Sequence, residues 1–174
     1  MWIDLEALTD VEEDYITAVG RALMVAQHFE ANCKDFAMWW IGSGALENGT
    51  AKSLCDLRSV SESLTELMLG RLINRLGADR DITKAEIAAL VRAKDARNYI
   101  AHEAVAATSF TSRFPRRRLD ELPLFEEAVR ALVEGDNLIS SWSYMFHEKE
   151  PSPARHVAEY PDHLVHWILA PLES

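Results

Sequence analysis

Apolar residues recur every three or four positions along most of the chain, which is the spacing of helices that bury one face. The pattern is clearest in the first long stretch, at Tyr15, Val19, Ala22, Ala26, Phe29, Cys33, Phe36 and Trp40. Thr9-Asp10-Val11-Glu12 is typical of a capping box at the start of this helix, and Gly42-Ser43-Gly44 predicts its end. The alternation of apolar and polar residues that marks strands does not occur. The pattern therefore predicts an all-α protein.

Three further long helices are predicted. The second runs from about residue 50 to 76 and ends at Gly77-Ala78-Asp79. The third opens at a capping box, Thr83-Lys84-Ala85-Glu86, and reaches about Ala107. A loop is predicted over 109–120, since the residue before Pro115 avoids the helical region. The fourth helix is expected to begin at Asp120, with Pro123 in its first turn, and to end at Glu150-Pro151-Ser152-Pro153.

The apolar stripes of these helices support their assignment. The second helix has Leu54, Leu57, Leu64, Leu67, Met68 and Leu72 on its inner face, and the fourth has Phe125, Ala128, Val129, Leu132, Ile139, Trp142 and Phe146. A short C-terminal helix is expected over 161–169, and the apolar residues of 2–8 form a further N-terminal segment. Long helices joined by short loops favour an antiparallel up-and-down four-helix bundle with short additional N- and C-terminal helical segments. We expect residues 1–174 to form one domain.

Composition and charge restrict the partners. Hydrophobic residues make up 48% and charged residues 26% of the chain, which is ordinary for a globular protein. The formal net charge of −10 repels a phosphate backbone, so nucleic acid must be bound through a local basic patch, and no DNA partner is expected. The start of the chain is acidic and no apolar run is long enough to span a bilayer. These features, with two cysteines far apart, predict a cytoplasmic protein with no membrane partner.

The predicted third helix contains the main candidate for chemistry, Arg97-Asn98-Tyr99-Ile100-Ala101-His102. Arginine is permanently charged and can hold an anion, and histidine can transfer a proton near neutral pH. In a regular helix Arg97 and His102 are about 140° apart, whereas Asn98 and His102 share a face. Because arginine is long, its guanidinium can reach that face. Arg97, Asn98 and His102 are therefore the candidate catalytic residues.

The spacing Arg-Asn-x-x-x-His on a late helix of a helical bundle resembles the R-x(4 to 6)-H motif of the HEPN superfamily, in which a polar residue commonly follows the arginine. The resemblance implies a metal-independent endoribonuclease of the toxin or phage-defence type. Its active site would be composite, formed by the motifs of both chains of a homodimer. His102 would act as general acid or base for attack by the RNA 2′-hydroxyl, Arg97 would hold the scissile phosphate, and Asn98 would orient one of them. Products would carry a 2′,3′-cyclic phosphate.

The resemblance also implies partners, and the chain departs from the family pattern at one position. RNA is the expected substrate, a second copy of the chain completes the site, and an antitoxin protein is a further candidate partner. Some members carry a tyrosine two residues after the histidine, which a nucleotidyltransferase antitoxin modifies. Ala104 stands at that position here. This mode of control is therefore not expected.

Two other functions remain open from the sequence. The bundle could be a non-catalytic HEPN-like module that dimerises or binds a partner protein, or it could bind a small molecule such as a nucleotide. If the motif is structural, Arg97 would form an ion pair with Asp95, Glu103 or an acidic residue of another helix, and His102 would be a hydrogen-bonded, partly buried histidine. A small-molecule site would instead be a polar cleft of the dimer that contains both copies of Arg97 and His102.

A basic cluster in the predicted loop is a candidate RNA-binding segment. Arg113, Arg116, Arg117 and Arg118 interleave with Phe110 and Phe114. Guanidinium groups and aromatic rings suit the phosphates and bases of single-stranded RNA. The alternatives are a solvated loop whose charge offsets nearby carboxylates, or a docking surface for an acidic antitoxin.

The remaining histidines suggest no site. His163 and His166 are three residues apart with His156 upstream, but a complete set of zinc ligands is missing. His28 and His147 stand alone. No cofactor and no metal are expected.

Overall fold

The computed structural model describes residues 10–65, 67–78, 82–107 and 115–173, and these residues are helical apart from short connections. The helices are α1 (Asp10–Glu47), α2 (Leu54–Thr65), α3 (Leu69–Leu76), α4 (Lys84–Tyr99), α5 (Val105–Ala107), α6 (Pro115–Glu148) and α7 (Ala154–Leu169). A π-helical turn, η2 (Ile100–Ala104), joins α4 to α5, and a 3₁₀ turn, η3 (Ala170–Glu173), follows α7. The described part of the chain has no strand, which confirms the all-α prediction.

The first helix is longer than predicted. It passes through Gly42 and Gly44 and ends at Glu47, two residues before Gly49, which has a φ of 72°. A glycine inside a helix costs about 1 kcal/mol, but Ile41 and Ala45 pack inward on either side of the glycines, and this packing outweighs the cost. Gly49 ends the helix because it adopts the left-handed conformation that favours glycine. The predicted capping box includes Thr9, which lies outside the described residues.

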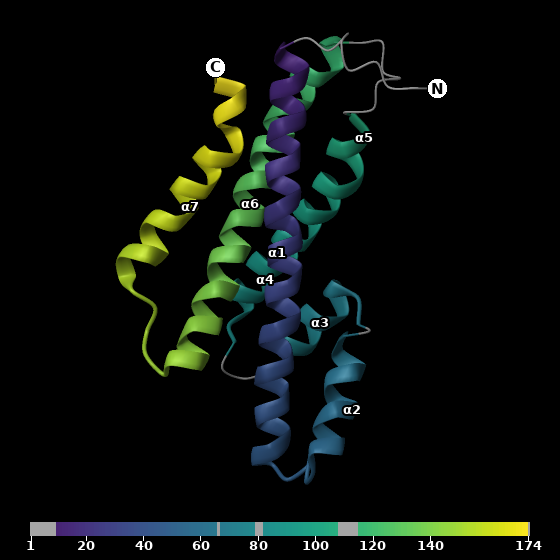
Figure 1. The fold of residues 1–174 in the computed structure, drawn as a ribbon, viewed down its shortest axis with the longest axis vertical. Coiled ribbons are helices and arrows are strands. Elements are labelled where there is room, and N and C mark those ends of the chain that lie inside the picture. Colours follow the sequence, from purple (N-terminus) through teal and green to yellow (C-terminus); the bar gives the residue numbers. More distant parts are fainter. Residues whose placement is uncertain (1–9, 66, 79–81, 108–114, 174) are drawn as a thin grey trace.

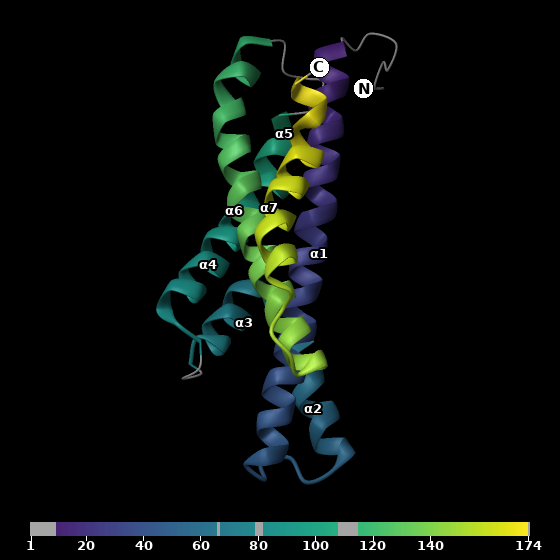
Figure 2. The same ribbon diagram turned by 90° about the vertical axis from the view of Figure 1, so that its left-hand side faces the viewer.

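The predicted second helix is two helices. It is interrupted between Thr65 and Leu69, and Met68, at the start of α3, has an extended ψ of 144° and a side chain that is 77% exposed. After this break the buried face of α3 is formed by Leu69, Leu72, Ile73 and Leu76. In Figures 1 and 2, α2 lies along the C-terminal half of α1, whereas α3 runs in a different direction. The break thus allows α3 to contact both α1 and α4.

The start of α4 is confirmed in detail. The Thr83 side chain accepts a hydrogen bond from the Glu86 amide, and the Glu86 carboxylate accepts one from the Thr83 amide. This is the predicted capping box. The helical path then continues to Ala107, as predicted, although it is not regular throughout.

The last two helices both begin earlier than predicted. α6 begins at Pro115 rather than Asp120, so this proline is the first helical residue, where its missing N–H costs nothing. Pro123 lies inside the helix rather than in its first turn. α7 begins at Ala154 rather than at residue 161. The predicted buried stripe of α6 is confirmed, with Phe146 only partly buried.

The core is formed where α1, α4 and α6 pack together, and α7 covers α6 and α1 on the side away from α4 (Figures 1 and 2). Phe29, Leu90, Phe125, Leu132 and Ile139 are fully buried there. The α4–α6 contact is especially close: a Cβ placed on Gly135 would lie 2.2 Å from the Ala93 Cβ. None of the described helices is long and apolar enough to cross a membrane.

Candidate functional site

The motif segment lies at an irregular place in the chain. α4 ends at Tyr99 and continues directly into the π turn Ile100–Ala104, which contains His102. Ile100 and Ala104 are buried and fix this turn to the core, while His102 is exposed. Single π turns inside helices are rare and occur frequently at functional sites. Because π-helical hydrogen bonds join residues five apart, the angle of about 140° expected for a regular helix does not apply between Arg97 and His102.

Arg97 is held by a carboxylate from another helix. Its Nη2 donates to Glu30 Oε2 of α1 at 2.5 Å, and its Nη1 donates to Asn98 Oδ1 at 3.2 Å. The Arg97 side chain is 28% exposed and that of Glu30 is 23% exposed. An ion pair with an acidic residue of another helix is one of the arrangements that the sequence left open. Asp95, another candidate partner, pairs with Lys94 instead.

Glu30 is the centre of a small charged network. It also accepts a hydrogen bond from Lys34 Nζ at 2.8 Å, one turn along α1. The Lys34 hydrogen bond and the nearby Arg97 charge lower the pKa of Glu30, against the opposing effect of burial. The carboxylate is therefore ionised at neutral pH and offsets part of the positive charge of Arg97.

His102 and Asn98 are both exposed on the motif segment. The His102 imidazole makes no hydrogen bond or ion pair with another residue in the described part of the chain, and Asn98 contacts Arg97. The imidazole is exposed among the described residues. This environment does not match the partly buried, hydrogen-bonded histidine of the non-catalytic alternative.

The charge around the motif is mixed. The pKa of Tyr99 is raised by burial and by the nearby carboxylates of Glu121 and Glu103. With Glu30, these residues place three carboxylates close to the motif segment. An anionic substrate would need more positive charge than the motif of one chain offers.

The predicted basic loop is only partly described. Arg113 lies outside the described residues. Residues 116–118 belong to the first turns of α6 rather than to a loop, and their side chains are likewise outside the description. In both views the start of α6 lies at the same end of the molecule as α5, which follows the motif (Figures 1 and 2).

Partly open cavities occur elsewhere in the molecule. Of three cavities in the described part of the chain, with volumes of about 400, 570 and 410 Å³, none is lined by Arg97, Asn98 or His102. These three cavities are therefore separate from the motif.

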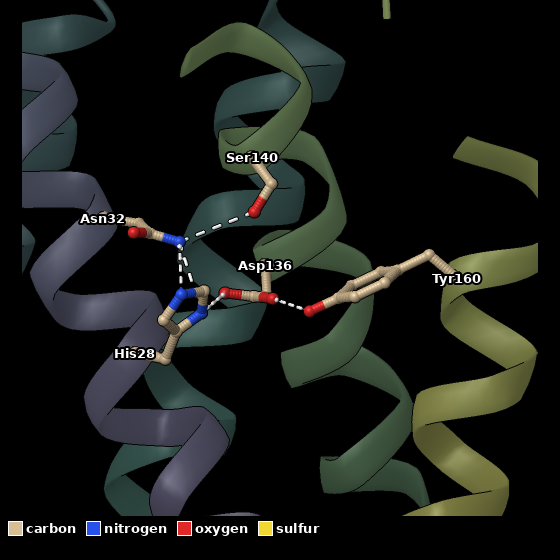
Figure 3. Close-up of polar contacts among 5 residues, drawn as sticks. All are labelled: His28, Asn32, Asp136, Ser140 and Tyr160. Atoms are coloured by element: carbon tan, nitrogen blue, oxygen red, sulfur yellow. Dashed lines mark hydrogen bonds and ion pairs between the residues drawn. The ribbon is translucent and has the colours of Figure 1, made fainter. Parts of the chain in front are cut away.

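A second polar cluster joins three helices, and it was not predicted. Asp136 of α6 is fully buried, the only charged side chain to be so among the described residues. One carboxylate oxygen lies 3.1 Å from His28 Nδ1 of α1, and the other accepts a 2.6 Å hydrogen bond from the Tyr160 hydroxyl of α7. Figure 3 shows the two side chains approaching Asp136 from opposite sides.

The cluster fixes the protonation of its members. A carboxylate oxygen accepts hydrogen bonds, so the His28 ring proton is assigned to Nδ1, which faces Asp136. Asn32 lies beside the ring, with its amide nitrogen 3.3 and 3.4 Å from the two ring nitrogens and 3.5 Å from Ser140 Oγ (Figure 3). Burial and the bond to Asp136 raise the pKa of Tyr160, so its hydroxyl remains a donor.

One sequence signal could have indicated this cluster. Asp136 lies four residues after Leu132 and three before Ile139, on the predicted buried stripe of α6. An acidic residue on a buried stripe needs a partner. No sequence rule identifies that partner, because His28 and Tyr160 are on helices whose packing the sequence leaves open.

The C-terminal histidines separate in the structure. His156 and His163 line the cavity beside the cluster, whereas the His166 ring lies 3.7 Å from the carboxylate of Glu173. In the described part of the chain, no group of three or more His, Cys, Asp or Glu side chains has an arrangement that could hold a metal ion.

Comparison with known proteins gives no match: no family model, no curated protein and no solved structure is similar to this chain.

Proposed function

We propose that this chain is an endoribonuclease that cuts RNA without a metal and whose active site is completed by a second copy of the chain. The observation that carries the proposal is the placement of Arg97, Asn98 and His102 on one continuous helical segment, with Arg97 partly exposed, Asn98 exposed, and His102 exposed in a π turn. The R-x(4 to 6)-H resemblance supplies the reaction. The proposal includes the arrangement of the helices, an up-and-down four-helix bundle built around α1, the segment from α4 to α5, and α6. It also includes a cytoplasmic location.

The motif residues suit the cleavage of a phosphodiester. The RNA 2′-oxygen attacks the adjacent phosphorus, and the bond to the 5′-oxygen breaks, which leaves a 2′,3′-cyclic phosphate and a 5′-hydroxyl. One histidine accepts the proton of the 2′-hydroxyl and another donates a proton to the leaving oxygen. In a two-fold dimer the two copies of His102 supply both roles, and the two copies of Arg97 offset the charge of the phosphorane.

The Glu30 contact leaves Arg97 able to bind phosphate. A guanidinium has five N–H donors, of which Glu30 and Asn98 each take one in the structure. The remaining donors are available to a phosphate oxygen. The ion pair thus positions the side chain, and a second Arg97 from the partner would offer further N–H donors to the same phosphate.

The ion pair also supports the competing function, a non-catalytic binding module in which Arg97 joins α4 to α1. In that case Arg97→Ala and Glu30→Gln would each destabilise the fold to a similar extent, and the double variant would be no worse than either. Neither change would alter the result of an RNA cleavage assay, because such a module leaves RNA intact.

The test is cleavage of a mixed RNA substrate in EDTA by wild type, His102→Ala and Arg97→Ala. We expect wild type to give 2′,3′-cyclic phosphate ends and His102→Ala to be at least about 100-fold slower, the usual contribution of general acid–base catalysis. Because His102 is exposed, its removal should leave the melting temperature unchanged. His166→Ala, another exposed histidine, is the matched control and should retain full activity. Intact RNA with wild type, or undiminished cleavage by His102→Ala, would refute the proposal.

A further inference from the structure

The cavity between the last turns of α1, the start of α4 and the end of α6 is separate from the motif, which lies at the other end of α4. Its volume is about 570 Å³, within the range of small-ligand sites. Much of its lining is aromatic, from Phe36, Trp40, Trp142 and Phe146. The charged groups of the lining belong to Glu47, Glu86 and Lys149. An apolar cavity with a few converging polar groups is the usual form of a small-molecule site.

The four aromatic rings of this lining do not form a flat stack. Phe36 stacks on Trp40, with their ring centroids 5.6 Å apart and an angle of 21° between the ring planes. Phe146 meets these two rings at 84° and 63°. Trp142 lies 5.4 Å from Phe36 at 40°. The rings therefore border the cavity in different orientations, as they do in the aromatic cages that surround ammonium groups.

One ring of the lining already holds a cation on its face. The Lys149 Nζ lies over the Phe146 ring, 4.3 Å from its centroid. The Lys149 side chain is exposed and forms no ion pair with another described residue. The negative face of an aromatic ring attracts a positive charge. Because both residues line the cavity, an ammonium group on a ring face is a contact that the lining itself makes.

The carboxylates leave the charge of the lining negative. Hydrogen bonds from Thr83, and a further one from Trp142, lower the pKa of Glu86 against the opposing effect of burial, so this carboxylate is ionised at neutral pH. Its hydrogen-bond donors are uncharged and leave its negative charge in place. Glu47, the last residue of α1, is exposed and forms no ion pair with another described residue. Two carboxylates thus face the single ammonium group of Lys149.

We propose that this cavity binds a small organic cation of the methylated-ammonium class, with its ammonium group against the Trp40 and Phe146 rings and its charge offset by the carboxylates. Lys149 is the internal competitor, and its ammonium group leaves the Phe146 face when the ligand enters. A lysine ammonium has three N–H donors that need acceptors or water, whereas a quaternary ammonium has none. Aromatic rings alone can therefore surround the ligand, and the flexible Lys149 side chain can move into solvent.

The test is calorimetric titration of the full chain with choline and with its neutral isostere, in which a tert-butyl group replaces the trimethylammonium group. The two probes share a shape and differ in charge. We expect one choline to bind per chain, roughly tenfold tighter than the isostere. His102→Ala should bind choline as wild type does, because the cavity is separate from the motif. The proposal is overturned if choline does not bind at millimolar concentration, or if the isostere binds equally well.

Two exposed charged residues give opposite predictions. Lys149→Gln removes the competing cation and makes the lining more negative, so choline should bind about threefold tighter or more. Glu47→Gln should weaken choline by about threefold or more. Glu62→Gln makes the same change in net charge on α2, in an exposed pair with Arg58, and should have no effect on choline. Unchanged or weaker binding by Lys149→Gln would overturn the proposal.

A pair of neighbouring tryptophans locates the binding. Trp40→Leu removes a ring of the lining but keeps an apolar side chain, and it should weaken choline roughly tenfold. Trp39→Leu is the matched control, because the Trp39 ring is 51% exposed and contacts His147 outside the lining. This variant should bind choline as wild type does. An equal loss in both variants, or a loss in neither, would contradict the assignment of the cavity.

Discussion

Two carboxylates determine the local chemistry of this molecule, and they differ in how they are paired. Asp136 is fully buried and is shared by a histidine and a tyrosine from two other helices. Glu30 is partly buried and is shared by Lys34 and Arg97. Both also raise the pKa of the buried thiol of Cys33, after the larger effect of burial itself. The pKa values of Glu30 and Cys33, both on α1, are thus shifted by charges on α4 and α6.

The pairing of Glu30 predicts a pH-dependent contribution to stability. Since the folded pKa of Glu30 is lowered from 4.5, its contribution is present above that pH and is lost as the pH falls through the folded value. We expect Glu30→Gln to reduce the free energy of unfolding by roughly 1 to 3 kcal/mol at pH 7. The difference from wild type should shrink steadily below about pH 4.5.

Urea unfolding from pH 7 down to pH 3 measures this effect. Glu62→Gln is the matched control, because Glu62 forms an exposed pair with Arg58 one turn away. That change should alter stability by less than about 1 kcal/mol. A Glu30→Gln difference that stays constant down to pH 3 would contradict the assignment of the network.

At the scale of elements, the approach of α4 to α6 sets the position of the motif. α4 contacts α6 through the Ala93–Gly135 pair, one turn before Arg97, and the π turn begins three residues after it. The small residues allow the two helices to come close. The same contact therefore fixes where Arg97 meets Glu30 and where His102 faces solvent.

This approach predicts opposite effects for two glycine-to-alanine changes. Gly135→Ala would place its Cβ against the Ala93 Cβ, and neither group can rotate away, so we expect a loss of about 1–3 kcal/mol in the free energy of unfolding. Gly20→Ala has no atom within 4 Å of its new Cβ and should gain up to about 1 kcal/mol from helix propensity. Chemical denaturation of both variants measures the difference, and stabilisation by both would show that the helices do not pack this closely.

At the scale of the whole molecule, the proposed activity depends on two chains. One chain supplies a single His102, whereas the proposed cleavage uses one imidazole to accept a proton and a second to donate one. A two-fold axis through the motif surface would supply the second imidazole. A composite site and a site contained in one chain therefore predict different results when intact and inactive chains are mixed.

Mixing chains tests it. Wild-type and His102→Ala chains are mixed in equal amounts and allowed to exchange. About a quarter of the dimers then contain two intact motifs. RNA cleavage should therefore fall to about a quarter of that given by wild type at the same total chain concentration. A site contained in one chain would retain about half. Sedimentation equilibrium should show particles of twice the 19.6 kDa chain mass in both samples. Half activity, or a monomer at the assay concentration, would contradict the composite site.

The sequence alone determined the helical character of the chain, the capping box at Thr83, the buried stripe of α6 and the residues of the motif, because these follow from local spacing and side-chain chemistry. It misplaced the ends of α1, α6 and α7 and the break before α3, because packing outweighs local preferences for glycine and proline. Only the tertiary structure paired Arg97 with Glu30 and Asp136 with His28 and Tyr160. These partners are up to 108 residues apart, so no local pattern records them, and helix packing alone brings their charges together.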